Sequence, residues 1–407
     1  MTKIQRRIAF YIFLALFIIL VPTIILYALG YSLNTKDMTI KPTGGIYLES
    51  EPKAQIYLNE KPRGKTPRFI KRLSPKIYNI RLTKKDYHQW EKQMTVEEGI
   101  VSKAENIILL PLNPKIQLTI KDKIQAYTLI NDDIIYATSQ SINYLDISRN
   151  QEEEMAKTKE TINSIATSQN QEYFLIQTPT THLLLNRKTQ TTTDLNQIIK
   201  KKSKYSITEI SNPKFNNNGD KIYFLSKNNL YSITTENLTL SEPLKQNILN
   251  YTKYKDGIIY LEYFTGKIYE LDLTSLESSE ISNQVFPSLT TGEWKISENN
   301  KKLLCQKQNS IEIVYLEETT EDSMIKKKGE IQTIQIKEKI NEAEWYTETN
   351  KHILISTPTA ILFTELDLRP PRNTINYITT ENPKIEYNQD KNILYFLSQE
   401  RLYQTKI

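Results

Sequence analysis

Cysteine, glycine and histidine are the scarce residues of this chain. The single cysteine, Cys305, excludes an intrachain disulfide and a thiol-rich metal site. It ends the apolar run Lys-Leu-Leu-Cys, which predicts a buried strand thiol. The three histidines, His88, His182 and His352, lie far apart and have no neighbour at metal-ligand spacing. We therefore expect no metal and no other cofactor.

Ten glycines stand against 25 tyrosines, in a chain rich in Ile, Thr and Asn. Tyr, Ile and Thr favour strands, and Asn replaces Gly in turns because it tolerates positive φ. Low glycine is therefore compatible with a turn-rich β protein. The 407 residues, with 39% hydrophobic and 25% charged side chains, predict two or three globular modules. A net charge of +6 is too small to indicate nucleic acid, so we expect no such partner.

Catalytic motifs are also missing. No Gly-x-Ser-x-Gly elbow occurs, and the segment 59–66, which ends in Gly-Lys-Thr, has Asn59 at the first glycine of a phosphate loop and is interrupted by Pro62. Residues 50–53 fit Ser-x-x-Lys but lie in an expected turn without companion motifs. These observations favour a noncatalytic protein.

The N-terminal region contains one long hydrophobic run. Residues 8–33 carry no charge and exceed the roughly 20 residues that a bilayer span needs. The flanking charges are Lys3, Arg6 and Arg7 before the run, and Lys36 and Asp37 after it. The positive-inside rule predicts a cytoplasmic tail at 1–7, a transmembrane helix at 8–33 and the remainder outside the cytoplasm. The alternative is a cleaved signal, with Ala28 and Gly30 as its small-residue site.

A short linker, 34–43, is expected to reach at most about 35 Å when extended, and a β-sandwich follows at 44–112. Apolar and polar residues alternate in 45–50, 54–58 and 77–82, as in half-buried strands. We expect Tyr57 and Trp90 to be core residues of this module.

The order of motifs in 44–112 resembles the PEGA domain. That family has a strand ending in Ser-x-Pro, then Ala-x-Val-Tyr-Val, then Gly-x-Thr-Pro, then a Gly-Tyr-x-x-Trp-like corner. The corresponding segments here are 50–52, 54–58, 64–67 and 86–90, with Asp86 in place of the usual glycine. The resemblance implies an extracytoplasmic surface module without catalysis.

This module is strongly basic, with twelve Lys and Arg against four Asp and Glu between residues 51 and 92. Close to a membrane, such a surface would feel anionic headgroups within a Debye length. Anionic wall polymer is an equal candidate, and a merely solvated face is the alternative. The residues predicted to bind an anionic surface are Lys61, Arg63, Lys65, Arg68, Lys71, Arg72, Lys84 and Lys85.

The remainder, 115–407, repeats itself. Seven units, each with an apolar strand, a polar turn and a second strand, start roughly 36 to 50 residues apart. That period is typical of propeller blades, so we expect a seven-bladed β-propeller, with an open β array as the alternative. Residues 115–120 would then supply the missing outer strand of the last blade and close the ring.

Several units share an Asn-rich turn before the apolar strand. They resemble TolB-like propeller repeats, in which Trp-Ser-Pro-Asp-Gly-Lys precedes the strand. Gly219 keeps the glycine of that pattern, and Asn300 and Asn350 are expected to replace it. Two further expectations are that Trp294 and Trp345 pack between blades and that the lysine run 200–204 forms an exposed loop.

The sequence thus predicts an all-β chain with an N-terminal transmembrane helix, a small PEGA-type β-sandwich and a β-propeller. We expect a bacterial envelope protein that binds or scaffolds an envelope protein or an anionic cell-surface polymer. The alternative is an extracytoplasmic hydrolase or lyase built on the propeller. A cluster of acids with a histidine in the central channel would favour that enzyme.

Overall fold

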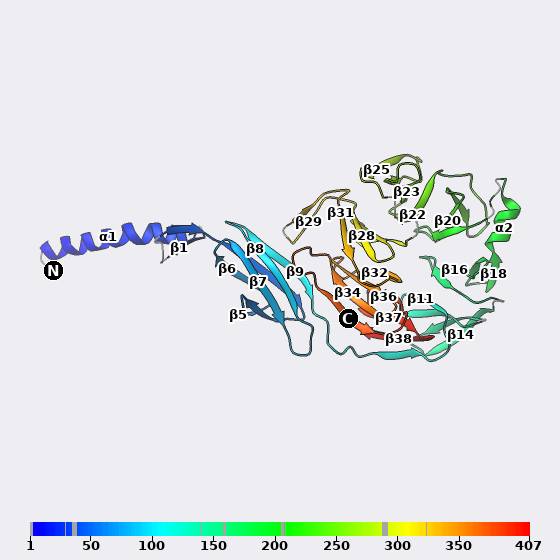
Figure 1. Ribbon diagram of the computed structural model, residues 1–407, viewed down its shortest axis with the longest axis horizontal. Helices are drawn as coiled ribbons and strands as arrows, with labels where there is room; N and C mark the ends of the chain where they lie inside the picture. The colour runs from blue at the N-terminus through cyan, green and yellow to red at the C-terminus, as the bar shows by residue number, and fades with distance from the viewer. Residues whose placement is uncertain are drawn as a thin grey trace. The chain divides into compact units, whose positions relative to one another are not determined.

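The computed structural model describes residues 3–28, 30–34, 39–139, 141–157, 160–204, 207, 209–286, 292–322 and 324–407. The chain divides into two compact units. Unit 1 comprises Met1–Leu112 with the short segments Thr320–Met324 and Asp367–Asn373, and unit 2 comprises the rest. Figure 1 labels their helices and strands.

Unit 1 begins with α1 (Lys3–Ala28), whose stretch Ile4–Ala28 is long and apolar enough to cross a membrane. The predicted span, 8–33, is too long at its C-terminal end, because the helix stops at Ala28. The helix ends earlier because Gly30 adopts a φ of +85°, a left-handed conformation that commonly stops helices. The strand β1 (Tyr31–Asn34) then pairs with β2 (Thr39–Pro42). Of the predicted linker, 34–43, residue Asn34 ends β1 and Thr39–Pro42 form β2, and Lys36 and Asp37 lie outside the described residues.

Two sheets form the sandwich of unit 1, in the orders β6-β3-β9 and β5-β4-β7-β8. β3 pairs with β9 in parallel and with β6 antiparallel. The strands are β3 (Gly44–Glu51), β4 (Gln55–Leu58), β5 (Lys61–Lys65), β6 (Arg68–Leu73), β7 (Lys76–Thr83), β8 (Trp90–Val96) and β9 (Val101–Ile108). Their inward side chains make one hydrophobic core that includes Ile56, Leu82 and Trp90.

The alternation in β4 places Ile56 and Leu58 inside, so Tyr57 points to the other face. Tyr57 is half-buried, with the Arg81 guanidinium 4.8 Å from its ring centre. The prediction that Tyr57 is a core residue is wrong, whereas Trp90, 4% exposed, is in the core as predicted.

The segment that resembled a phosphate loop is a hairpin. Asn59 and Glu60 both have positive φ, 46° and 65°, and they join β4 to β5 in a tight turn. The Gly-Lys pair that follows lies in β5, so the glycine does not open a helix.

One buried lysine fixes a later segment of unit 1. Lys92 of β8 is 1% exposed. Its Nζ donates to the backbone oxygens of Asp367, Arg369 and Pro371 at 3.1, 2.6 and 2.9 Å. The Arg369 guanidinium binds the Asp367 carboxylate in turn. A charged group in this place is therefore satisfied by three carbonyls.

Unit 2 consists mainly of seven sheets of three or four strands among its described residues. The first sheet consists of β11 (Ala126–Ile130), β12 (Asp133–Ala137), β13 (Ser141–Asp146) and β14 (Gln151–Lys157). The second consists of β15 (Ser164–Thr167), β16 (Tyr173–Gln177), β17 (His182–Asn186) and β18 (Thr191–Asp194). The third consists of β19 (Ser211–Phe215), β20 (Lys221–Ser226) and β21 (Asn229–Thr234).

The next two are β22 (Ile248–Tyr254), β23 (Gly257–Glu262), β24 (Ile268–Leu271) and β25 (Ser278–Ser282), and β26 (Trp294–Ile296), β27 (Lys302–Gln306), β28 (Ser310–Tyr315) and β31 (Ile331–Gln335). A ribbon of β29 (Thr319–Glu321) and β30 (Met324–Lys326) interrupts the latter. The last two are β32 (Glu342–Tyr346), β33 (His352–Ser356), β34 (Ala360–Glu365) and β35 (Thr374–Thr379), and β36 (Lys384–Asn388), β37 (Ile393–Ser398), β38 (Arg401–Lys406) and β10 (Gln117–Ile120).

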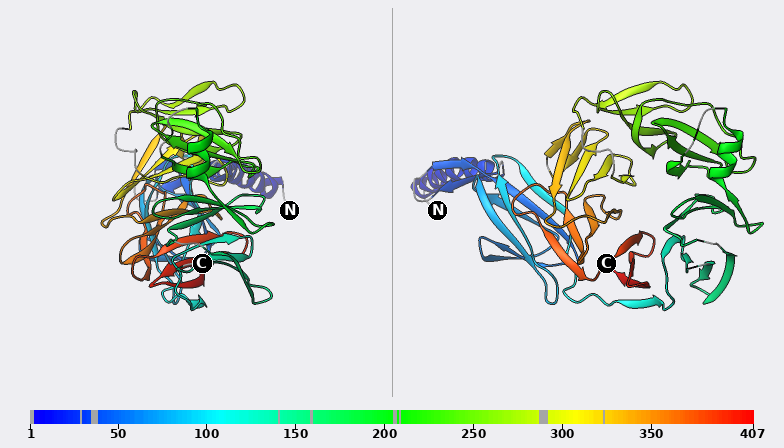
Figure 2. Two further views of the ribbon diagram at one scale, coloured as in Figure 1. Left: turned by 90° about the vertical axis from the view of Figure 1, so that its right-hand side faces the viewer. Right: turned by 45° about the vertical axis from the view of Figure 1, so that its right-hand side comes forward.

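The last sheet joins the two ends of unit 2. β10 pairs antiparallel with β38, Leu118 opposite Tyr403, as the sequence predicted for residues 115–120. Figure 2 shows the sheets following one another around a common centre. β10 covers the edge of β38 that would otherwise remain unpaired and itself becomes the outer strand of that sheet.

Hydrophobic clusters fill the spaces between successive sheets. Trp294 packs with its own sheet's Cys305 and with Ile259 of the preceding sheet, and Trp345 packs with Leu304 of the sheet before its own. Both tryptophans are 1% exposed, so they are packing residues as predicted, and Cys305 is a buried strand thiol. Burial raises the pKa of that thiol, which opposes formation of the reactive thiolate.

Asparagine takes the place of glycine at several turn positions that have a left-handed backbone conformation. Gly219 has a φ of 74°, and Asn300 and Asn350 have φ values of 57° and 51° at the corresponding turns, as predicted. Asn adopts this conformation more readily than other non-glycine residues.

The lysine run 200–204 is not a loop throughout, because Lys200 to Lys202 end α2 (Leu195–Lys202). The Asp194 carboxylate accepts the Gln197 backbone N–H at 3.0 Å and caps the helix, and Leu195 and Ile199 bury its inner face. Lysines in the last turn complement the helix dipole, so Lys200 to Lys202 are compatible with a helix where the sequence predicted a loop.

Candidate functional site

The first candidate surface is the basic edge, which we define as Lys61, Arg63, Lys65, Arg68, Lys71 and Arg72. The first three lie at alternate positions of β5 and the others lie on β6, and all six are exposed. β5 is an edge strand of one sheet and β6 an edge strand of the other. The two strands follow each other directly, so both edges contribute to one basic surface.

Aromatic groups accompany these charges. Phe69, 41% exposed, lies between Arg68 and Lys71, and the Lys71 Nζ is 5.3 Å from its ring centre. The Arg72 guanidinium lies 3.4 Å from the ring centre of Tyr27 in α1. The basic edge therefore meets the C-terminal end of the apolar helix.

Lys84 and Lys85, the other two predicted residues, lie apart from β6. They follow Thr83, which is in register with Gln55 and thus with Lys65 on the far side of β4. Lys85 is exposed and Lys84 half-buried, with its Nζ 4.7 Å from the Tyr87 ring centre. They extend the positive charge along one end of the sheet.

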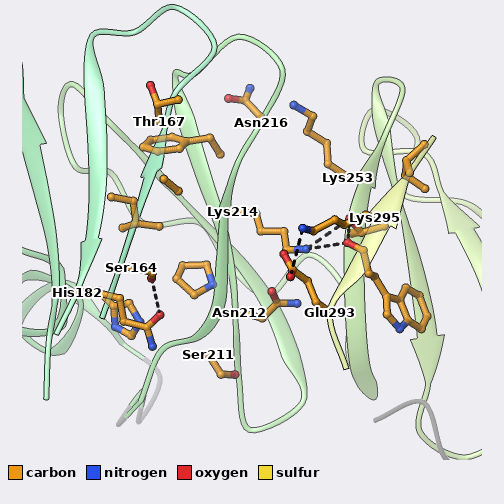
Figure 3. A pocket seen from close by; sticks show the side chains of 18 of the residues that line it. Ser164, Thr167, His182, Ser211, Asn212, Lys214, Asn216, Lys253, Glu293 and Lys295 are labelled. Atoms are coloured by element: carbon orange, nitrogen blue, oxygen red, sulfur yellow. Dashed lines mark hydrogen bonds and ion pairs between the residues drawn. The ribbon is translucent and has the colours of Figure 1, made fainter. Parts of the chain in front are cut away.

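The second candidate site is a polar cavity of about 1040 Å³ in unit 2. First strands of successive sheets line it, with side chains that include Lys214, Lys253, Lys295, Glu293, Glu344 and His182. Figure 3 shows Lys214, Lys295 and Glu293 together, and His182 beside Ser164 on the other side of the view.

Each of the seven sheets begins with a first strand, namely β11, β15, β19, β22, β26, β32 or β36. The strand register shows that one residue of each first strand occupies an equivalent position in its sheet. Lys214 pairs with Tyr223, Lys295 with Leu304 and Glu386 with Tyr395, and these partners all face the next sheet. We call this set the inner ring. Its members are Thr128, Ala166, Lys214, Thr252, Lys295, Glu344 and Glu386.

Three pairs of neighbours in the inner ring contact each other. The Lys214 Nζ lies 3.5 Å from the Thr252 hydroxyl, the Lys295 Nζ lies 2.5 Å from the Glu344 carboxylate, and the Thr128 hydroxyl lies 3.3 Å from the Glu386 carboxylate. Lysines occupy one side of the ring and glutamates the following positions, so the ring is electrically polarised.

The two ring lysines differ in their partners. Burial alone would lower the pKa of Lys295, but the Glu344 and Glu293 carboxylates outweigh it and the pKa is raised. Burial lowers the pKa of Lys214 to about 8, with Glu293 acting against this and Lys295 adding to it. Its Nζ donates to the Trp294 carbonyl at 3.3 Å, and in the described structure no carboxylate forms an ion pair with it. Lys214 is thus a half-buried cation held by neutral oxygens.

The cavity contains glutamates and a histidine, the combination that would favour an enzyme. In the part of the chain that the structure describes, however, no hydrogen bond or ion pair joins His182 to Glu293 or Glu344. His182 opens β17, is 9% exposed, and has a lowered pKa because of burial. Its Nδ1 has no hydrogen-bond partner within the described ranges. Among the described residues, no group of three or more His, Cys, Asp or Glu side chains could hold a metal ion.

Carboxylates of the first strands, Glu386 of the inner ring and Glu342 outside it, also join one sheet to the next. The backbone N–H of Leu129 donates to Glu386 at 3.0 Å, and that of Ile385 donates to Glu342 at 2.7 Å. First strands have one ladder neighbour each, so these side chains satisfy backbone groups that would lack a partner. Burial raises the pKa of Glu386 to about 7.

Replacement of Glu386 with Gln is expected to change how stability depends on pH. The folded chain holds this proton up to a pH of about 7, whereas the unfolded chain releases it near 4.5. The stability that the group contributes is therefore complete at low pH and is lost as pH rises through 7. At pH 8 the Gln variant should be more stable than the parent by on the order of 1–3 kcal/mol, measured by urea unfolding at pH 5 and 8. The exposed Glu381→Gln serves as control, and an unchanged pH slope in Glu386→Gln would contradict the assignment.

Sequence reasoning did not find the inner ring. Its lysines and glutamates are single residues in different repeats, and only strand register makes them equivalent. The sequence did contain a positional signal. An apolar or aromatic residue ends the strand before each Asn-rich turn, and the residue directly before it is Lys214, Lys295 or Glu386.

The sequence of the sandwich matches one known family model, described as the PEGA domain, over residues 43–107. The chain carries a PEGA domain. The predicted resemblance is confirmed over nearly the predicted range. No curated protein matches the chain.

Solved structures identify the fold that accompanies the PEGA domain. The β-propeller domain of Cps50 (Swd1) from Myceliophteria thermophila aligns with a TM-score of 0.51 at 11% identity, over 72% of this chain and 99% of that one. An extracellular domain from B. thetaiotaomicron, described as part of a hybrid two component system, gives 0.52 at 10% identity, over 81% of this chain and 45% of that one. Unit 2 thus has a propeller fold, and the number of blades stays a prediction. A PEGA domain with a propeller indicates an extracellular β-propeller protein.

Proposed function

We propose that the chain is a noncatalytic, single-pass membrane-anchored protein of the cell envelope that binds an anionic surface through its basic edge. α1 would be the anchor, with its N-terminus in the cytoplasm and both units outside. The observation that carries the proposal is the exposure of six cationic side chains on two adjacent edge strands. Lipid headgroups and anionic wall polymer both offer the complementary charge.

The position of the basic edge in unit 1 supports a surface close to the bilayer. Arg72 stacks on Tyr27, a residue of the last turn of α1. Aromatic side chains at the end of a span commonly lie at headgroup level. Lysines and arginines near an anionic membrane surface gain about 1 kcal/mol each, and this gain falls off within a Debye length of about 8 Å at physiological salt.

Basic residues on edge strands have a second role, which is to keep exposed edges from pairing with other chains. The two roles differ in their response to an anionic surface. Only a binding role requires affinity for such a surface, and only that affinity should disappear as salt screens the charges.

The soluble region 39–407 is expected to bind vesicles containing phosphatidylglycerol, or isolated anionic wall polymer, and to ignore phosphatidylcholine vesicles. Co-sedimentation should show binding at low salt that weakens steeply between 50 and about 300 mM salt. Joint replacement of Lys61, Arg63, Lys65 and Arg68 with Gln should weaken binding at least about tenfold, a change of 1.4 kcal/mol. These side chains are exposed, so the variant should unfold like the parent.

A matched control removes the same charge from unit 2, by replacing the exposed Lys200, Lys201, Lys327 and Lys328 with Gln. If both quadruple variants lose binding equally, net charge rather than the basic edge is responsible. If the parent ignores anionic surfaces at low salt, the charges serve only to protect the strand edges and the proposal fails.

A further inference from the structure

A second ligand site is suggested by the polar cavity of unit 2, which is separate from the basic edge. The inner ring carries Ala166 on one sheet and Lys214 on the next. Alanine leaves empty the space that a longer side chain would fill beside Lys214. Both residues line the cavity, which therefore extends to the least compensated cation of the ring.

The groups around this space are suited to an anion that also carries hydroxyls. Amide and hydroxyl side chains line the same cavity, among them Asn212, Asn216, Gln177 and Ser211. The nearby carboxylates Glu293 and Glu344 are both engaged by Lys295. Lys253 is the third lysine of the lining, beside Lys214 and Lys295. Amides and hydroxyls fix the orientation of a polyhydroxylated ligand, while a cation selects its charge.

Two polar groups in this region lack a full set of protein partners. The Lys214 Nζ contacts only neutral oxygens, at 3.3 and 3.5 Å. The buried Nδ1 of His182 is unpaired among the described residues. The His182 Nδ1 is closed off from the cavity, so the Lys214 Nζ is the group to which a ligand in the cavity would supply a missing partner.

We propose that this cavity binds an acidic sugar, with its carboxylate at Lys214 in the space beside Ala166. The amide and hydroxyl groups around it hold the sugar hydroxyls. The ligand is thus a small carboxylated saccharide, free or as the terminal unit of a chain. Lys295 does not make the principal contact, because two glutamates already occupy it.

The test is titration calorimetry of the soluble region 39–407 with D-glucuronate, D-glucose and inorganic phosphate. Glucuronate should bind at one site, and glucose, which lacks the carboxylate, at least tenfold more weakly. Lys214→Met should weaken glucuronate binding at least tenfold. The control is Lys267→Met, which removes a lysine paired with Glu280 away from the cavity and should leave the affinity unchanged.

The pH dependence of glucuronate binding by the parent chain is a second test, and it does not require any variant to fold. The Lys214 ammonium has a pKa of about 8, so glucuronate affinity should fall as pH rises from 7 to 10, and binding at pH 8.5 should take up protons from the buffer. No binding of glucuronate at millimolar concentration, equal binding of glucose, a flat pH profile, or equal loss in both lysine variants would each overturn the proposal. Binding of phosphate with exclusion of glucuronate would overturn the sugar assignment.

Discussion

Lys92→Met is expected to lower the free energy of unfolding of unit 1 by about 3–5 kcal/mol. Methionine keeps the length of the side chain but cannot donate to the carbonyl oxygens of Asp367, Arg369 and Pro371, which Lys92 joins. Three acceptors would then lose a charged donor in a place where Lys92 is only 1% exposed. Thermal or urea unfolding of the soluble region, followed by a probe in unit 1, measures the change.

The control for this substitution is Thr95→Ala on the same strand, where the side chain is exposed and little change is expected. Protection of the segment 367–373 from hydrogen exchange gives a local readout. It should fall in Lys92→Met and persist in the control. A Lys92→Met variant as stable as the parent would mean that water replaces the ammonium at no cost, and the three-carbonyl contact would not be a structural requirement.

Trp90→Ala is expected to cost about 3–5 kcal/mol, because the ring is 4% exposed in the sandwich core and its loss leaves a large cavity. Tyr57→Ala is the matched comparison, since Tyr57 is an aromatic residue of the same sheet on the opposite face. It should cost about 1 kcal/mol or less. Urea unfolding of both variants tests the difference directly.

Equal destabilisation by the two substitutions would contradict this assignment of faces. A third variant, Arg81→Met, separates the contribution of the cation that lies over the Tyr57 ring. It should resemble Tyr57→Ala in its small effect, because both groups are partly in contact with solvent.

The contrast between Tyr57 and Trp90 shows what alternation in a sequence can decide. Period two predicted the strand 54–58 correctly, but both of its faces carry apolar side chains, with Ile56 and Leu58 on one and Tyr57 on the other. Which face is buried depends on the second sheet of the sandwich. Information about that partner is not contained in the strand itself.

Composition was sufficient to predict the turns, and the number of repeats was sufficient to predict the closure of the sheets. Asn at the left-handed turns and β10 beside β38 followed from composition and repeat count. The end of α1 and the helical lysines of α2 were missed, because a glycine turn and an aspartate cap outweighed the hydropathy and charge patterns. The basic edge was predicted because it is contiguous in sequence, whereas the cavity draws one or two residues from each of several repeats.

The pairing of β10 with β38 constrains how the chain is made. β10 leaves the ribosome before every other strand of unit 2, and its partner β38 is the last strand of that unit to be synthesised. Through that interval it remains an unsatisfied edge that could join a neighbouring copy. Lys115, Lys121 and Lys123 flank this strand, and such charges act as gatekeepers that discourage aggregation until β38 has been made.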